Sequence, residues 1–263
     1  MHSTTLLEPK CSLPEFHVLG VRVSAVEISD VVRQMEQWIQ MREGSQYIAV
    51  TGMHGVMEAQ KDPRFKVILN AAGLVVPDGM PLVWLARQHD IPLEHRVSGA
   101  ELMEAFCQHT GSTYRHFLYG GAPGVAKELA KIMELRFGSR VVGTYCPPFR
   151  PVNGEEKQEI VALIRSARPD ILWVGLSTPK QERWMFEYRE LLEVPVLLGV
   201  GAAFDFHTGR SQRAPEWMRE RGLEWSYRLM KEPRRLWRRY LILGSQFAAR
   251  ASWEIIKERN KPN

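Results

Sequence analysis

The chain has 263 residues, 44% of them hydrophobic, and a formal net charge of +5. This length and composition predict a folded globular protein with a sizeable core and argue against a disordered chain. Three cysteines without CxxC spacing argue against a disulfide framework or a zinc cage and favour a reducing compartment. Glu8, Pro9 and Lys10 interrupt the stretch where a signal peptide needs apolar residues, and no apolar run reaches membrane-spanning length. We therefore expect a cytoplasmic protein.

Strand-like and helix-like segments alternate from residue 16 to residue 201. Such alternation is typical of βαβ units, so we predict a Rossmann-like α/β fold with a largely parallel sheet and helices on both faces. The predicted strands are Phe16–Val23, Tyr47–Thr51, Leu74–Val76, His116–Tyr119, Val141–Tyr145, Ile171–Gly175 and Val196–Val200. The helix-period stretches between them include Val31–Met41, Ala100–His109, Val125–Phe137 and Glu155–Ser166.

A Trp-rich and Arg-rich helical region follows. Pro215 and Pro233 mark predicted helix starts. The last helix carries an apolar stripe with spacings of three and four residues. The stripe consists of Leu236, Tyr240, Leu243, Phe247 and Ala251. We therefore divide the chain into an α/β catalytic core, residues 1–205, and a basic amphipathic helical appendage, residues 206–263.

Positive charge is concentrated in this appendage. Residues 210–263 contain 14 Lys and Arg against 6 Asp and Glu, and the rest of the chain is net negative. The cluster of Arg234, Arg235, Arg238 and Arg239 crowds the start of the last helix, where the helix dipole disfavours cations. The cluster indicates a phosphate-bearing ligand or a membrane surface, with plain solvated arginines as the alternative.

Asp78 is the strongest candidate for a catalytic side chain. It follows the strand Leu74–Val76, and Pro77 and Gly79 predict a turn before the next helix. Open α/β sheets bind ligands beyond the carboxyl ends of their strands, where this carboxylate falls. An aspartate before a helix is more often a capping residue, and that alternative stays open here.

A glycine turn joins another predicted strand to the helix Val125–Phe137. Gly120, Gly121, Pro123 and Gly124 let the backbone approach a ligand closely, and the helix N-terminus favours a phosphate or a nucleotide. We therefore assign these four residues to nucleotide binding. Short Gly/Pro turns are also common as plain connectors.

Two more stretches fall at the same edge of the sheet. Gln181 follows the strand Ile171–Gly175, and its amide can both donate to and accept from sugar hydroxyls. Gly201 and Asp205 follow the last predicted strand and are also assigned to nucleotide binding. Gly199 and Gly201 imitate a dinucleotide fingerprint, but Phe204 stands where its third glycine belongs, which argues against a nicotinamide site.

No metal site is expected. The eight histidines do not cluster at metal-ligand spacing, and the chain has no Asp-x-Asp pair of the kind that holds a metal diphosphate. The sequence therefore predicts chemistry without a divalent metal.

Together these stretches resemble the WecG/TagA/CpsF family of bacterial glycosyltransferases, which move a sugar from a UDP-sugar to a polyprenyl-diphosphate-linked acceptor. The resemblance runs from about Tyr47 to Tyr240. It is carried by Pro77-Asp78-Gly79, Arg96-Val97-Ser98-Gly99, Gly121-Ala122-Pro123-Gly124, Pro179-Lys180-Gln181-Glu182, Phe204-Asp205 with Arg213-Ala214-Pro215, and Glu224-Trp225-Ser226-Tyr227-Arg228. Two positions depart from the family pattern, since Met53 replaces Asn and Glu101 replaces Asp.

The resemblance implies an inverting transferase of surface or exopolysaccharide synthesis with Asp78 as the general base. It implies substrate contacts at Thr51, Arg96 and Gln181, and arginines that close over the diphosphate at Arg228, Arg235 and Arg238. The UDP-sugar is a substrate, so no cofactor is expected. The implied location is peripheral, on the cytoplasmic face of the inner membrane, where the basic helix meets anionic lipid.

Two rival functions remain open at this point. The partial glycine pattern favours a nicotinamide-dependent oxidoreductase. The tail charge favours a non-catalytic basic module for membranes or nucleic acid. The aromatic residues of the tail lie in predicted helices and do not form a platform on which bases could stack, so we expect no nucleic-acid partner. A homo-oligomer is compatible with the sequence.

Overall fold

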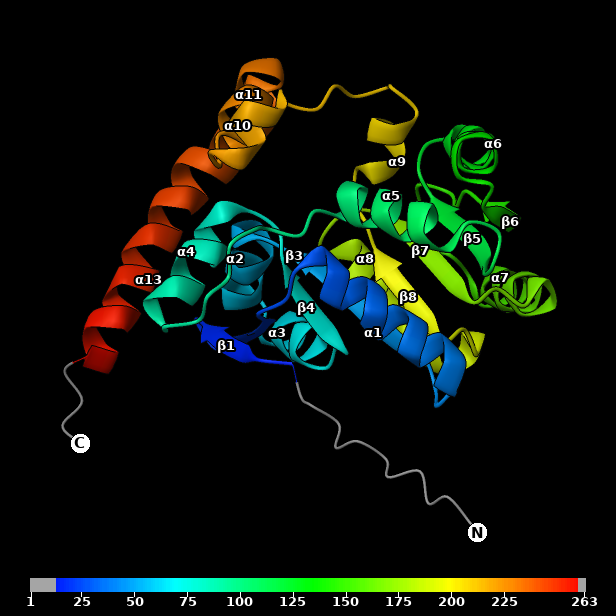
Figure 1. The fold of residues 1–263 in the computed structure, drawn as a ribbon, viewed down its shortest axis with the longest axis horizontal. Helices are drawn as coiled ribbons and strands as arrows, with labels where there is room; N and C mark the ends of the chain where they lie inside the picture. The colour runs from blue at the N-terminus through cyan, green and yellow to red at the C-terminus, as the bar shows by residue number, and fades with distance from the viewer. Residues whose placement is uncertain (1–12, 260–263) are drawn as a thin grey trace, which may run out of the picture.

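The computed structural model describes residues 13–259, apart from the side chains of Glu220, Arg235, Glu258 and Arg259. Its centre is a six-stranded parallel sheet with the strand order β4-β3-β8-β7-β5-β6 (Figure 1). The strands are β3 (Gln46–Thr51), β4 (Leu74–Pro77), β5 (Arg115–Gly120), β6 (Arg140–Tyr145), β7 (Ile171–Gly175) and β8 (Val196–Gly199). The predicted parallel α/β sheet is confirmed, and each of these strands was predicted to within one residue at either end.

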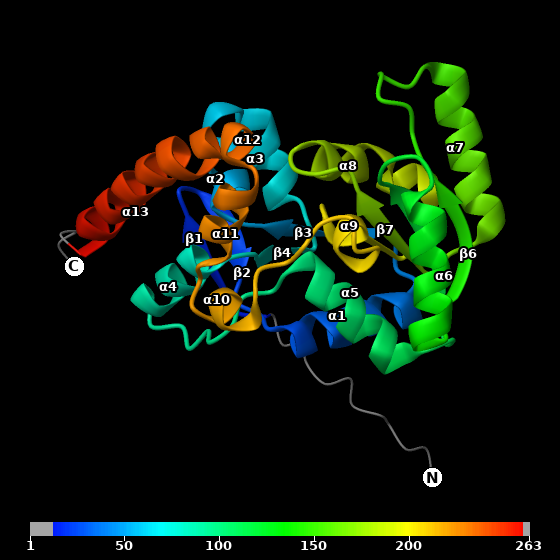
Figure 2. The ribbon, with the colours of Figure 1, turned by 90° about the horizontal axis from the view of Figure 1, so that it is seen from above.

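The sheet is buried on both faces. In β3, Tyr47 and Ala49 enter one core and Ile48 and Val50 the other, because successive side chains of a strand alternate. Figure 2 shows helices on both faces of the sheet. One face is covered by α1 (Ile28–Met41), α5 (Gly99–Thr110) and α6 (Val125–Phe137), the other by α2 (Met53–Lys61), α3 (Pro63–Asn70), α7 (Gly154–Ala167) and α8 (Lys180–Leu192). Strands buried in this way read as continuous apolar runs.

The single strand predicted for Phe16–Val23 is wrong. The segment forms an antiparallel hairpin of β1 (Glu15–Val18) and β2 (Val21–Ser24), outside the main sheet. Leu19 and Gly20 connect the two strands with φ of 53° and 76°, and a type I′ hairpin turn requires positive φ at both positions. The hairpin contacts β4 and α4 (Met80–Gln88).

The C-terminal region is helical, as predicted. It contains α9 (Ala203–His207), α10 (Glu216–Glu220), α11 (Glu224–Lys231), α12 (Pro233–Trp237), the π-helix η1 (Arg238–Ile242) and α13 (Leu243–Arg259). Pro215 caps α10 and Pro233 begins α12, so both predicted helix starts are confirmed. The predicted boundary after Asp205 falls inside α9. No helix among the described residues is long and apolar enough to cross a membrane.

The predicted apolar stripe docks the last helix onto the core. Leu236, Phe247 and Ala251 are buried, and α13 contacts α2. A backbone contact strengthens this docking, because the Leu19 N–H donates to the Glu254 carboxylate at 2.7 Å. In Figure 1 the long α13 runs along the side of the molecule that carries α2. The appendage is therefore packed on the half of the sheet that ends in β3 and β4.

Candidate active site

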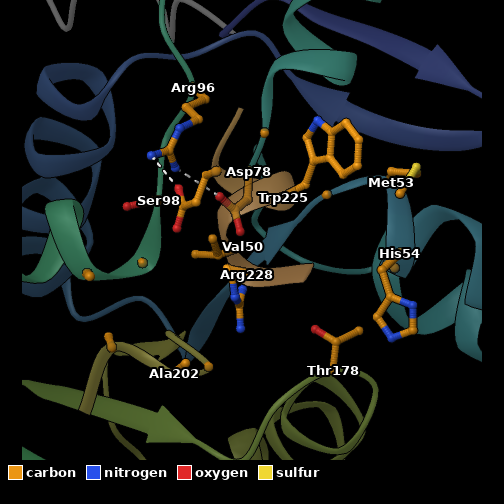
Figure 3. A pocket seen from close by; sticks show the side chains of 18 of the residues that line it. Val50, Met53, His54, Asp78, Arg96, Ser98, Thr178, Ala202, Trp225 and Arg228 are labelled. Atoms are coloured by element: carbon orange, nitrogen blue, oxygen red, sulfur yellow. Dashed lines mark hydrogen bonds and ion pairs between the residues drawn. The ribbon is translucent and has the colours of Figure 1, made fainter. Parts of the chain in front are cut away.

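A cavity of about 370 Å³ lies at the carboxyl ends of β3, β4 and β8 (Figure 3). One side, here called the core wall, comes from these strand ends and the start of α8 and includes Gly52, Asp78, Gln181 and Gly201. The other side, the appendage wall, includes Glu224, Trp225, Arg228, Arg239 and Tyr240. Open α/β sheets bind ligands at this edge.

Backbone contacts fix Asp78 at the end of β4. Its N–H donates to the Thr51 carbonyl of β3 at 2.9 Å. A Cβ at Gly52 would lie 2.2 Å from the Asp78 carbonyl oxygen, so only glycine permits this approach of the two chains. Helix α4 is capped by Gly79 without a side-chain hydrogen bond, so the capping alternative for Asp78 is wrong. The carboxylate instead faces the cavity, with 43% of the side chain exposed.

The charge environment of Asp78 suits a base. Desolvation by the protein around the cavity raises the pKa of its carboxyl group, although part of the side chain stays exposed. The guanidinium of Arg96, 3.4 Å away, opposes this rise, and the Glu224 carboxylate adds to it. A carboxylate with a raised pKa accepts a proton more readily once it is ionised.

Arg96 is held beside Asp78 by the backbone as well. The N–H of its neighbour Val97 donates to the Pro77 carbonyl at 2.8 Å, next to Asp78 in the chain. Only 10% of the Arg96 side chain is exposed, and its guanidinium also pairs with Glu224 at 2.9 Å and Glu101 at 3.6 Å. Arg96 therefore lies between three carboxylates.

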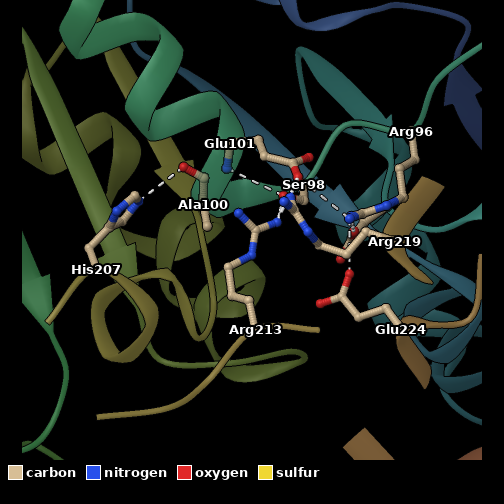
Figure 4. Close-up of polar contacts among 9 residues, drawn as sticks. Arg96, Ser98, Ala100, Glu101, His207, Arg213, Arg219 and Glu224 are labelled. Atoms are coloured by element: carbon tan, nitrogen blue, oxygen red, sulfur yellow. Dashed lines mark hydrogen bonds and ion pairs between the residues drawn. The ribbon is translucent and has the colours of Figure 1, made fainter. Parts of the chain in front are cut away.

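A second group of charges ties the appendage to the start of α5 (Figure 4). Glu101 accepts from Arg213 at 2.7 Å and also pairs with Arg219. Ser98 caps α5 by accepting from the Glu101 N–H. Although burial acts to raise it, the guanidiniums of Arg96 and Arg213 hold the pKa of Glu101 below its usual value. No local residue pattern indicates that these arginines contact Glu101.

Gln181 lies in the core wall with its side chain almost fully engaged. Its Oε1 accepts from the Gly201 N–H at 3.0 Å, and its Nε2 donates to Glu182 at 3.1 Å. Glu182 is buried and also accepts from Thr178 at 2.6 Å, and burial raises the pKa of its carboxyl group. A Cβ at Gly199 would lie 2.8 Å from the Gln181 amide. Gly199 therefore leaves room for the Gln181 side chain. This packing requirement explains one of the two glycines that resemble a dinucleotide fingerprint.

The arginines of α11, α12 and η1 differ in whether they line the cavity. Arg228 and Arg239 line the cavity, and both contribute positive charge that lowers the pKa of Asp78. Arg238 is exposed and does not line the cavity, and its guanidinium lies 5.3 Å from the ring of Trp237. The side chain of Arg235 lies outside the described residues. Sequence reasoning placed Arg239 in the basic cluster of the tail but did not single it out as a substrate contact, because the residue pattern does not show which of these arginines lines the cavity.

His54 of α2 lines the cavity beneath the appendage. Burial, followed by the nearby charge of Arg239, lowers the pKa of His54 to about 4. Its imidazole is therefore neutral at physiological pH. Its neighbour Met53, one of the departures from the family pattern, also lines the cavity, and a Cβ at Gly244 of α13 would lie 3.7 Å from its sulfur.

Other predicted site residues lie at the same edge without lining the cavity. Thr51 is buried and contributes its carbonyl to Asp78. Of the residues assigned to nucleotide binding, Gly201 lines the cavity; those that do not are Gly120, Gly121, Pro123, Gly124 and Asp205. Gly120 is required by packing, since a Cβ there would lie 2.5 Å from the Gly175 carbonyl. Nucleotide binding at these five residues stays a prediction.

Within residues 13–259, no three His, Cys, Asp or Glu side chains are grouped so as to hold a metal ion. Cys107 and Cys146 are free thiols, and Cys11 lies outside the described residues. The charges that face the cavity are those of the arginines and carboxylates described above.

Comparison with known proteins agrees with the motifs and the fold. The chain is 28% identical over 224 residues to the N-acetylglucosaminyldiphosphoundecaprenol N-acetyl-beta-D-mannosaminyltransferase of Bacillus spizizenii, and the match covers 85% of each protein. A sequence model described as the glycosyl transferase WecG/TagA/CpsF family matches residues 16–261. This match includes both walls of the cavity. The chain therefore belongs to the WecG/TagA/CpsF family of glycosyltransferases.

Proposed function

We propose that this protein transfers a hexosyl or N-acetylhexosaminyl group, with inversion, from a UDP-sugar to a polyprenyl-diphosphate-linked saccharide during cell-envelope polysaccharide synthesis. The observation that carries the proposal is one cavity in which the Asp78 carboxylate faces Arg228 and Arg239. A base and a cluster of cations are the two components that glycosyl transfer from a nucleotide sugar requires without a metal.

Asp78 is the proposed general base. The acceptor hydroxyl attacks the anomeric carbon of the donor, the bond from that carbon to the UDP oxygen breaks, and Asp78 takes the hydroxyl proton. The attack comes from the side opposite the leaving group, so the configuration inverts. The raised pKa of Asp78 makes it a better proton acceptor than an ordinary aspartate, and the position at a rigid strand end keeps it in place.

Arg228 and Arg239 are proposed to bind the diphosphate of the donor or of the acceptor. As the sugar leaves, negative charge accumulates on UDP, and guanidiniums stabilise phosphate oxygens through charge-assisted hydrogen bonds. Arg235, whose side chain is not described, stays a proposed contact. Gln181 stays a proposed sugar contact through the amide hydrogen that it does not use toward Glu182.

The proposed acceptor class draws on the relative from Bacillus spizizenii, whose name gives a diphosphoundecaprenol-linked N-acetylglucosamine as the acceptor. A lipid-linked acceptor requires the cavity to reach a membrane surface. The appendage that forms one wall of the cavity also exposes large apolar side chains, as a peripheral membrane surface does. They include Trp217, Trp237, Leu241, Ile242 and Trp253. We therefore place the protein peripherally on the cytoplasmic face of the inner membrane.

A panel of UDP-sugars with a short-chain polyprenyl-diphosphate N-acetylglucosamine tests the transferase activity. We expect one UDP-sugar to give a glycosylated lipid product of inverted anomeric configuration, read by mass spectrometry and NMR, with Asp78→Asn as the inactive control. Release of free sugar without a lipid product, or thermal stabilisation by NAD and not by UDP, would contradict the proposal.

Membrane binding needs a separate test. Wild-type protein should sediment with vesicles that contain anionic phosphatidylglycerol and less with neutral phosphatidylcholine vesicles, because each basic residue near an anionic surface contributes about 1 kcal/mol. A Trp237→Ser, Leu241→Ser double variant should bind both vesicles more weakly while keeping activity on a water-soluble acceptor. Equal sedimentation of the two proteins would contradict a membrane role for this surface.

A further inference from the structure

The Arg96 guanidinium is shared unequally between three carboxylates. The nearest is Glu224 of the appendage, at 2.9 Å, whereas Asp78 is at 3.4 Å and Glu101 at 3.6 Å. Glu101 has its own partners in Arg213 and Arg219. Glu224 is therefore the carboxylate closest to Arg96, and unlike Glu101 it has no other ion pair among the described residues.

This unequal sharing matters for the neighbouring base. A guanidinium matches a carboxylate through two parallel N–H···O bonds, and such a pair both lowers the carboxyl pKa and occupies its lone pairs. Between Arg96 and Asp78 there is a single long hydrogen bond, from Nη1 to Oδ1. The ion pair of the same guanidinium with Glu224 is shorter, through Nη2. Glu224 thus holds one nitrogen of the Arg96 guanidinium, while the other makes the long hydrogen bond to Asp78.

We propose that Glu224 is a positioning residue that competes with Asp78 for the Arg96 guanidinium and so leaves the Asp78 carboxylate free to accept the acceptor proton. The inference rests on the proposed function in taking Asp78 as the base. Glu224 itself touches no reacting atom in this role. It acts on Asp78 through Arg96 and through its own negative charge, and it does so only while α11 is docked on the cavity.

Removal of the Glu224 charge should let Arg96 move onto Asp78. The other charged or titratable groups around the cavity would be unchanged, namely Arg228 of α11, Arg239 of η1, His54 of α2, and Arg213 and Arg219, which Glu101 engages. Arg96 lowers the pKa of Asp78 and Glu224 raises it. Loss of the Glu224 carboxylate and release of the Arg96 guanidinium should therefore both lower the pKa of Asp78.

The test compares Glu224→Gln with Glu216→Gln, an isosteric change at an exposed glutamate of α10. Protein labelled with 13C at the aspartate carboxyl carbon is titrated by NMR, and Asp78→Asn assigns the signal. We expect the Asp78 midpoint to fall by about one pH unit in Glu224→Gln, and not to move in Glu216→Gln. The acidic limb of the kcat/KM profile should move with it, with kcat at neutral pH reduced roughly threefold to tenfold.

Several outcomes decide the question. An unmoved midpoint in a folded Glu224→Gln protein overturns the proposal even if activity falls, because the lost activity would then not come from a change in the pKa of Asp78. If thermal unfolding shows that Glu224→Gln does not fold, Glu224→Asp is used instead. Its shorter side chain should hold Arg96 less well, so the Asp78 midpoint should fall below the wild-type value. A wild-type midpoint with reduced kcat overturns the proposal. The NMR result does not depend on turnover. A moved midpoint in a protein without transferase activity would leave this inference standing and refute the proposed function instead.

Discussion

The core wall and the appendage wall of the cavity are held by different interactions. Asp78 follows a strand in which every residue is buried, and its own N–H is bonded to the neighbouring strand. Helix α11, which carries Glu224 and Arg228, buries no residue of its own and meets the core through ion pairs such as that of Glu224 with Arg96. The proposed base is thus fixed by the backbone, whereas the charge around it comes from side chains that can change their conformation. Substitutions on the two walls should therefore have different effects on turnover and on substrate binding.

The largest effect is expected on the core wall, from Asp78→Asn. The variant keeps the shape of the side chain and removes the base, and loss of a general base typically lowers kcat by about 10²–10⁴-fold. Thermal unfolding and UDP binding by calorimetry should stay close to wild type. A variant with wild-type turnover, or one that is inactive because it is unfolded, would show that Asp78 has a structural role instead.

The appendage wall is tested by two neighbouring arginines. Arg239→Ala removes a guanidinium that lines the cavity, and a hydrogen bond to a charged group contributes about 1.5–3 kcal/mol, so kcat/KM for the UDP-sugar should fall roughly 10- to 100-fold. Arg238→Ala, one residue away and outside the cavity, is the matched control and should change kcat/KM on a soluble acceptor by less than about threefold. An equal loss of kcat/KM in the two variants would mean that lining the cavity does not distinguish Arg239 from Arg238.

The sheet beneath the core wall should show its own response to acid. His116 is fully buried, its Nδ1 accepts from the Trp173 indole at 3.0 Å, and burial lowers its pKa from 6.5 to about 4. The folded state keeps His116 neutral while the unfolded chain binds a proton below pH 6.5, so its stabilising contribution is complete above that pH and is lost as the pH falls toward 4. Between pH 7 and pH 5 the free energy of unfolding should drop by about 2 kcal/mol from this residue.

Urea unfolding at the two pH values measures this drop. His116→Gln should flatten the pH dependence, while the same change at the exposed His95 should not. A pH dependence that survives in His116→Gln would assign the acid sensitivity to another group, with His54 as the first alternative because its pKa is also about 4.

The smallest expected effect is that of chelation. Arg228 and Arg239 supply positive charge for a diphosphate, so EDTA should change the transfer rate by less than about twofold. Activity lost in EDTA and restored by Mg²⁺ or Mn²⁺ would show that the arginines of the appendage wall do not neutralise the diphosphate without a metal ion.

The sheet was predictable because buried parallel strands leave continuous apolar runs, and Asp78 was predictable because a strand, a turn and a helix surround it in the sequence. The hairpin was missed because Leu19 occupies a turn position that the sequence marks only by Gly20. Strand order depends on contacts between distant segments, which no local pattern reports.

The electrostatic part of the site was the least predictable. Arg96 was found from the family motif, but its pairing with Glu224 joins residues more than a hundred positions apart. The tail is rich in arginine throughout, so composition alone does not separate Arg239 from Arg238. Consecutive residues of a helix point about 100° apart, so the docking of the appendage decides which of the two lines the cavity.

The place of β8 in the sheet has a consequence for synthesis of the chain. β8 is the last strand to be made, yet it lies at the centre, pairing with β3 on one side and β7 on the other. A nascent chain that ends before Val196 holds two separate half-sheets, β4-β3 and β7-β5-β6, each with an apolar edge that lacks its neighbour. Chains stalled on the ribosome at that point should be cleaved readily by protease, and those that extend beyond the appendage should resist it.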